Sequence, residues 1–170
     1  MQKRKPPLPD DIAKVLADLL GRAVTAKASA PLAESRAAVF ALFGDKSGSL
    51  GAAVACDLAA AANLGAALSM IPPSRAQEVV RAGALDATLA ENVREVFNVA
   101  SGLFNFTGVG HQTDAQLGAA GLTVSLTKFL TVPPAVPPPL VAMLKKCPGR
   151  VDLDLAITGY GAGKIAIYVV

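Results

Sequence analysis

The sequence predicts an α+β fold, in which an antiparallel sheet packs against long helices. Residues 37–43 and 50–55 are short apolar runs on either side of Gly-Asp-Lys-Ser-Gly, a pattern typical of two antiparallel strands joined by a hairpin loop. Residues 85–105 carry apolar side chains at helical spacing. Residues 151–158 alternate apolar and charged side chains, as a half-buried strand does.

A chain of 170 residues is most simply one domain, spanning 1–170, and it can bury roughly 70% of its unfolded surface. Hydrophobic residues make up 52% of the chain and charged residues 17%, which indicates a packed globule rather than a disordered chain. Alanine supplies much of the apolar share. The core is therefore expected to consist of closely packed helices and short aliphatic strands.

The first half of the chain is expected to start with a helix that Asp10 or Asp11 caps and that runs to about Arg22. The hairpin follows this helix. Asp57 is then predicted to cap an alanine-rich helix, which the Pro-Pro pair at 72–73 ends.

Ser74 and Gln77 have the spacing of a capping box, for a short helix that ends near Gly83. The long helix comes next. Residues 108–121 are expected to form irregular chain or a weak edge strand, and residues 122–130 alternate enough to predict a strand.

The C-terminal part begins with a stiff proline-rich connection at 133–139, followed by a short helix through Lys146. Two strands, 151–158 and 164–170, close the chain and are joined by a glycine-rich turn. The helices and strands do not alternate regularly, which favours an antiparallel sheet over a doubly wound parallel one.

The charge balance argues against a nucleic-acid partner. The formal net charge is +3, part of it from Lys3, Arg4 and Lys5, and neither a basic stripe nor aromatic residues placed for stacking are visible. Cys56 and Cys147 are too few and too far apart for a metal cage or a disulfide framework. We expect two free thiols in a reducing compartment.

A membrane span is the alternative for residues 50–71, because only Asp57 and Asn63 interrupt this largely apolar stretch. Its residues are mostly alanine and glycine, which insert weakly, and a central Asp costs about 3 kcal/mol in a bilayer. A buried strand followed by a buried helix explains the stretch better. We expect a soluble, cytoplasmic protein without a membrane partner.

The long helix carries the candidate functional residues. At about 100° per residue, Glu91, Glu95, Asn98 and Gly102 lie within one narrow sector. An apolar stripe lies opposite that sector and comprises Leu85, Leu89, Val93, Val96, Ala100 and Leu103. Two like charges at i,i+4 cost a few tenths of a kcal/mol, and a glycine removes a side chain beside them. This polar face suits a molecule that docks closely on it, although a solvated helix face has the same composition.

Glu95, Asn98 and Gly102 stand in the segment Glu-Val-Phe-Asn-Val-Ala-Ser-Gly. This segment resembles the Glu-Ile-Gly-Asn-Ile-x-x-Gly signature of the CheC/CheX/FliY family of phosphatases, which dephosphorylate the chemotaxis response regulator CheY. The order of hairpin, capped helix, long helix and later strand also resembles that family. The length is similar to that of CheX, which has one such helix. The sequence differs from the family at Glu91, where Asp or Ser is usual, and at Phe97, where a small residue is usual.

The resemblance implies an enzyme that hydrolyses the phosphoaspartate of a CheY-like receiver domain. Asn98 would position the attacking water, Glu95 would pair with the receiver's lysine, and Glu91 and Gly102 would contact the partner. The receiver would supply Mg²⁺, so this chain would need no cofactor of its own. The resemblance is also compatible with a homodimer that shares a sheet edge. The alternative is a non-catalytic receiver-binding or scaffold module of a two-component pathway on the same fold.

Other motifs carry less weight. The run from Gly159 to Lys164 resembles a phosphate-binding loop, but a strand-forming segment follows it, so a structural turn is favoured. His111 has no partners for a zinc site and is expected in a surface loop. Asp152 and Asp154 share one face of a strand, where solvated carboxylates are more common than a cation site.

Overall fold

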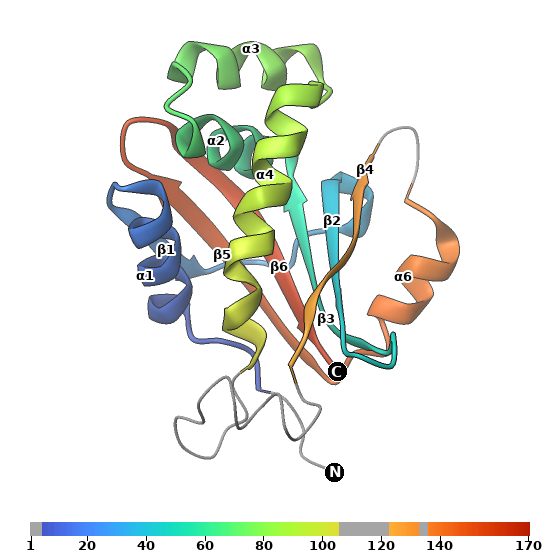
Figure 1. The fold of residues 1–170 in the computed structure, drawn as a ribbon. Helices are drawn as coiled ribbons and strands as arrows, with labels where there is room; N and C mark the ends of the chain where they lie inside the picture. Colours follow the sequence, from blue (N-terminus) through green and yellow to red (C-terminus); the bar gives the residue numbers. More distant parts are fainter. Residues whose placement is uncertain (1–4, 106–122, 133–135) are drawn as a thin grey trace.

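A six-stranded antiparallel sheet forms the centre of the molecule, with the strand order β1-β5-β6-β3-β2-β4. The computed structural model describes residues 5–105, 123–132 and 136–170. The strands are β1 (Val24–Ala28), β2 (Ala37–Gly44), β3 (Leu50–Asp57), β4 (Ser125–Thr131), β5 (Gly149–Ile157) and β6 (Gly161–Val169). The helices are α1 (Pro9–Leu20), α2 (Leu58–Leu68), α3 (Pro73–Ala82), α4 (Ala87–Ala100) and α6 (Pro138–Leu144). This arrangement is the predicted α+β fold (Figure 1).

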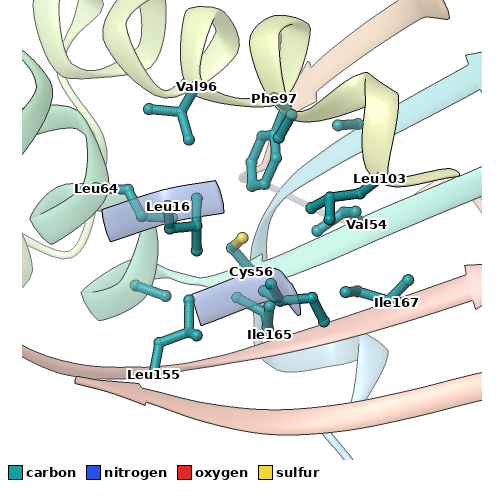
Figure 2. Packing of buried hydrophobic residues seen from close by; sticks show 14 of the residues in the cluster. Leu16, Val54, Cys56, Leu64, Val96, Phe97, Leu103, Leu155, Ile165 and Ile167 are labelled. Carbon is teal, nitrogen blue, oxygen red and sulfur yellow. The ribbon is translucent and has the colours of Figure 1, made fainter. Parts of the chain in front are cut away.

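Alternate residues of each central strand point to opposite faces of the sheet and join two different core clusters. On β2, Val39, Ala41 and Phe43 pack toward α1, α2 and α4, whereas Phe40 packs toward α6. The larger cluster lies between the helices and the sheet, where Phe97 of α4 points down toward Val54 and Ile167 (Figure 2). The long helix is therefore anchored in the main core of the protein.

Several predicted elements are confirmed. The hairpin is formed by β2 and β3, and the Asp57 carboxylate caps α2 by accepting a 2.8 Å hydrogen bond from the Ala60 amide. The stretch 50–71 is accordingly a strand followed by a helix. None of the helices in the described residues is long and apolar enough to cross a membrane. Cys56 and Cys147 are free thiols, and burial raises the pKa of the Cys56 thiol well above its ordinary value.

Two predicted helix caps are wrong. Helix α1 begins at Pro9 with Leu8 as its N-cap, so Asp10 and Asp11 lie in the first turn and cap nothing. Helix α3 begins at Pro73 after Pro72, which places Ser74 inside the helix. In both cases a proline at the start supplies the fixed backbone angle that favours a first helical turn, so no side-chain cap is required.

The strands at the two sheet edges also differ from the prediction. Strand β1 was not predicted, because its five residues include only one that is buried, Val24. Strand β4 begins at Ser125, three residues later than expected. The predicted irregular segment 108–121, including His111, lies outside the described residues.

The C-terminal strands carry an ion-pair network in place of the expected solvated carboxylates. The Asp152 carboxylate accepts hydrogen bonds of 2.8 Å from Nε and Nη2 of Arg150 and from the Leu32 amide. Arg150 also lies 3.3 Å from the Glu34 carboxylate, and its guanidinium stacks 4.9 Å from the centre of the Tyr168 ring. Asp154 pairs separately with Lys164 at 2.9 Å. These contacts hold the segment before β2 against the sheet.

Tyr168 is expected to make the protein less stable at high pH. Burial of its ring raises the pKa of Tyr168 to about 12. The unfolded chain loses this proton near pH 10, so the folded state holds more protons and the free energy of unfolding falls as pH rises from 10 to 12. Chemical denaturation at several pH values measures this slope. Tyr168→Phe serves as the control and should flatten the slope, whereas an unchanged slope would show that other groups cause it.

Candidate functional site

The candidate site lies on α4, which is shorter than the predicted helix over 85–105. Asp86 is the N-cap, and its carboxylate accepts a 2.8 Å hydrogen bond from the Leu89 amide. The α-helix ends at Ala100, and Ser101–Asn105 continues as a 3-10 helix, η2. Gly102 therefore lies in η2, two residues beyond the end of the α-helix that carries the other candidate residues.

The apolar stripe predicted for this helix is confirmed. Leu89, Val93 and Val96 are fully buried, and Phe97 adds an aromatic ring that the stripe did not include. Ala100 and Leu103 are also buried, while Leu85 is half-buried before the helix begins. Helix α4 therefore cannot rotate about its axis without exposing this stripe. The burial of the stripe fixes the direction of the opposite, polar face.

Helix α4 packs very closely on α2 at one glycine. A Cβ atom added at Gly65 would lie 2.7 Å from the Leu89 carbonyl oxygen, so only glycine lets the two helices approach this far. The Asn92 side chain donates a 2.9 Å hydrogen bond to the Gly65 carbonyl oxygen. Together these contacts set the position of α4 along α2.

Glu91, Glu95 and Asn98 are exposed, as predicted, on the face of α4 away from the core. Nδ2 of Asn98 lies 3.4 Å from Oε2 of Glu95, a long hydrogen bond that leaves both groups available to another molecule. Glu91 pairs with Arg94 at 3.2 Å. The sequence analysis considered only the repulsion between Glu91 and Glu95 at i,i+4. The ion pair of Glu91 with Arg94 at i,i+3 offsets that repulsion.

The surface around Asn98 is open. Gly102 is exposed, and a Cβ atom added there would meet no atom within 4 Å. Val99, next to Asn98 in sequence, is 51% exposed and adds an apolar patch that the motif did not indicate. The sequence feature that could have identified Val99 as exposed is its position outside the buried apolar stripe. An exposed valine beside a carboxylate and a carboxamide is a composition that suits a protein partner.

The face combines a negative charge, a group that both donates and accepts hydrogen bonds, and an apolar contact. A carboxamide of this kind can hold a water molecule, and an exposed carboxylate can pair with a cation of a partner. No group of three or more histidine, cysteine or acidic side chains able to hold a metal occurs within residues 5–105, 123–132 and 136–170. Strand β6 begins at Gly161, inside the glycine-rich run, so the run leads into a strand rather than into the helix that a phosphate-binding loop requires.

Neither family models nor curated proteins match this sequence. Solved structures match it in fold. FliY from Thermotoga maritima is 16% identical, with a TM-score of 0.56 over 92% of this chain and 81% of FliY. CheX in the CheX-CheY-BeF3-Mg²⁺ complex from Borrelia burgdorferi is 15% identical, with a TM-score of 0.51 over 94% of this chain and 93% of that one.

The middle domain of FliM from H. pylori is also similar, at 8% identity and a TM-score of 0.52, covering 95% of this chain and 84% of that domain. At these identities the likeness concerns the arrangement of helices and strands. The sequence predicted an α+β fold with an antiparallel sheet against long helices, and these matches agree with that prediction at the level of the fold. The chain therefore has the CheC/CheX/FliY fold.

Proposed function

We propose that this protein hydrolyses the phosphoaspartate of a CheY-like receiver domain, with Glu95 and Asn98 of α4 inserted beside the phosphoryl group. The observation that carries the proposal is that these two side chains are adjacent and exposed on a helix whose other face is fully packed. A rigid support of this kind fixes the position of both groups, and positioning supplies most of the catalysis in phosphoryl transfer. The CheX–CheY complex among the similar structures supports the choice of partner.

The proposed reaction uses water as the nucleophile. The Asn98 carboxamide holds a water molecule in line with the bond between phosphorus and the receiver's aspartate oxygen. The water oxygen bonds to phosphorus, the bond to the aspartate oxygen breaks, and its electron pair remains on the released carboxylate. Both protons of the water leave with the inorganic phosphate, which is released as H2PO4⁻. Mg²⁺ belongs to the receiver in this scheme, and Glu95 pairs with the receiver's lysine.

The test is the decay of a phosphorylated receiver from the same organism, followed in Mg²⁺ with and without this protein. Acceleration at protein concentrations below that of the receiver would establish catalytic turnover. An unchanged decay with several receivers, while the protein is folded, would contradict the phosphatase proposal.

A non-catalytic receiver-binding or scaffold role is the second candidate. The likeness to the FliM middle domain favours it, because solved complexes of that protein contain FliG or SpeE as partners. Binding of a receiver activated with BeF3 and Mg²⁺, measured by calorimetry, separates the two candidates when it is combined with the decay experiment. Binding without acceleration would identify a module that docks on receivers without catalysis.

The proposal includes a homodimer that shares a sheet edge. In the described part of the chain, strands β1 and β4 are the two edges of the sheet, and each pairs with one neighbour, β5 and β2 respectively. Light scattering gives the mass in solution, and a monomeric mass at micromolar concentration would contradict this part of the proposal.

Glu95→Gln is expected to weaken receiver binding more than Glu91→Gln does. Among the residues that the structure describes, Glu95 has a hydrogen bond only to the neutral Asn98, whereas Glu91 already has Arg94 as an ion-pair partner. Loss of a hydrogen bond to a charged group costs about 1.5–3 kcal/mol, which is roughly a tenfold to hundredfold rise in KM with kcat little changed. Steady-state kinetics on the phosphorylated receiver measure both constants. Equal losses in the two variants would contradict the distinct role of Glu95.

A further inference from the structure

A second candidate binding site lies away from the exposed face of α4. It is an open cleft of about 520 Å³ between α2, α3 and the turn that joins β5 to β6. The residues lining it are Ala59, Asn63, Gln77, Val80, Arg81, Tyr160, Gly161 and Ala162. The cleft includes residues 160–162 of the glycine-rich run, which the proposed phosphatase function does not use.

Asn63 lines this cleft and is unusual for its surroundings. It is 7% exposed and is the one buried polar residue in the part of the chain that the structure describes. It stands in a helix made almost entirely of alanine, glycine and leucine. Its Nδ2 lies 3.5 Å from the Ala162 carbonyl oxygen, at the outer limit of a hydrogen bond. The carboxamide therefore retains donor and acceptor capacity that a molecule in the cleft can use.

The turn between β5 and β6 leaves this carboxamide open to the cleft. Gly161 has a φ of +141°, and a Cβ atom there would lie 3.3 Å from Nδ2 of Asn63. Any other residue would therefore be strained and would crowd Asn63. Tyr160, on the adjacent wall, is held in place because its hydroxyl donates a 2.8 Å hydrogen bond to the Ile71 carbonyl oxygen and Arg22 stacks 4.7 Å from its ring centre.

The outer rim of the cleft is cationic and partly apolar. Arg81 is exposed, its Nε donates to the Gln77 carbonyl oxygen at 3.3 Å, and it pairs with no carboxylate among the residues described. Arg75 of the same helix, in contrast, pairs with both Glu78 and Asp86. Val80 is 38% exposed beside Arg81. The rim thus offers a positive charge and an apolar contact next to the buried carboxamide.

We propose that this cleft binds an extended acidic peptide segment of another protein. A peptide amide matches the Asn63 carboxamide, because each group offers one donor and one acceptor. An apolar side chain of the segment packs on Val80 and Ala59, and an adjacent carboxylate pairs with Arg81. The open shape lets a chain enter and leave the cleft. This proposal is independent of the phosphatase activity on α4.

The test is selection of short random peptides displayed on phage against the folded protein, followed by synthesis of the enriched sequences. Fluorescence anisotropy then gives Kd for the protein and its variants. The enriched peptides should combine an apolar residue with Asp or Glu. Arg81→Ala should weaken their binding about tenfold, and Val80→Asp should weaken it further by repulsion. Lys146→Ala, an exposed lysine just beyond α6, is the control with the same charge change and should leave Kd unchanged.

Asn63→Leu separates a ligand-binding role from a structural one. If Asn63 binds the peptide, the variant should lose peptide affinity. If Asn63 only stabilises the fold through its hydrogen bond to Ala162, the variant should have a lower melting temperature and the same peptide Kd. Because Arg81 and Val80 are exposed, their variants remain folded even if Asn63→Leu does not. Failure to enrich any peptide would overturn the proposal. So would enriched peptides that bind Arg81→Ala and Val80→Asp as tightly as the unchanged protein.

Discussion

Asn98→Ala is expected to lower the phosphatase turnover by at least a hundredfold while leaving the fold intact. Removing one hydrogen-bonding group that is positioned for the transition state typically costs about 10²–10³ in kcat. The side chain is exposed, and within the described part of the chain its one hydrogen bond is the 3.4 Å bond to Glu95. Alanine has a higher helix propensity than asparagine, so the free energy of unfolding should change by less than about 0.5 kcal/mol. Decay of the phosphorylated receiver and thermal unfolding measure the two quantities.

Asn92→Ala is the matched control on the same helix. Asn92 points toward α2 and donates to the Gly65 carbonyl oxygen at 2.9 Å. Its removal leaves the carbonyl of the buried Gly65 without this partner and should cost about 1–3 kcal/mol of stability. At temperatures where Asn92→Ala is folded, its phosphatase turnover should persist. Normal turnover in Asn98→Ala would contradict the water-positioning mechanism, and loss of turnover in both variants would point to helix position rather than to the carboxamide.

The features that the sequence predicted correctly are those set by local pattern. The stripe from Leu89 to Ala100 has a clear helical period, and Asp57 caps α2 because an acidic side chain at that point bonds the free amides of the first turn. The exposed face with Glu95 and Asn98 follows from the same period. What this face binds does not follow from it, because a solvated helix surface has the same pattern.

The features that were missed depend on contacts between distant residues. Strand β1 exists because β5 offers a free edge, and its own residues, Val-Thr-Ala-Lys-Ala, lack a distinct alternation. Asp152 is tied to Leu32, 120 positions earlier in the chain. The cleft around Asn63 likewise gathers residues from α2, α3 and the β5–β6 turn. The glycine run was predicted to be a turn over 159–163, but the turn covers only 158–160 and β6 begins at Gly161. Its position beside Asn63 depends on the packing of α2 against β6.

Gly65→Ala is expected to destabilise the protein by about 2 kcal/mol, although alanine normally favours a helix. The added Cβ would lie 2.7 Å from the Leu89 carbonyl oxygen, which is backbone and cannot move aside as a side chain can. Overpacking of this kind costs about 1–3 kcal/mol, and the displaced helix also weakens the Asn92 hydrogen bond, which together outweigh a gain of up to about 1 kcal/mol in helix propensity. For a chain of this length we expect the melting temperature to fall by about 4–8 °C.

Gly102→Ala is the matched control for this variant, because a Cβ atom there meets nothing within 4 Å. Its melting temperature should equal or slightly exceed that of the unchanged protein. The two variants also separate the roles of the glycines in the proposed reaction. Gly65→Ala shifts α4 as a whole, and a displacement of a few tenths of an ångström at Asn98 should reduce turnover even at temperatures where the variant is folded. Gly102→Ala leaves α4 in place, so any loss of receiver affinity in that variant would come from the partner's close approach. A rise in melting temperature for Gly65→Ala would show instead that α2 and α4 have room to separate, and that their spacing does not fix the site.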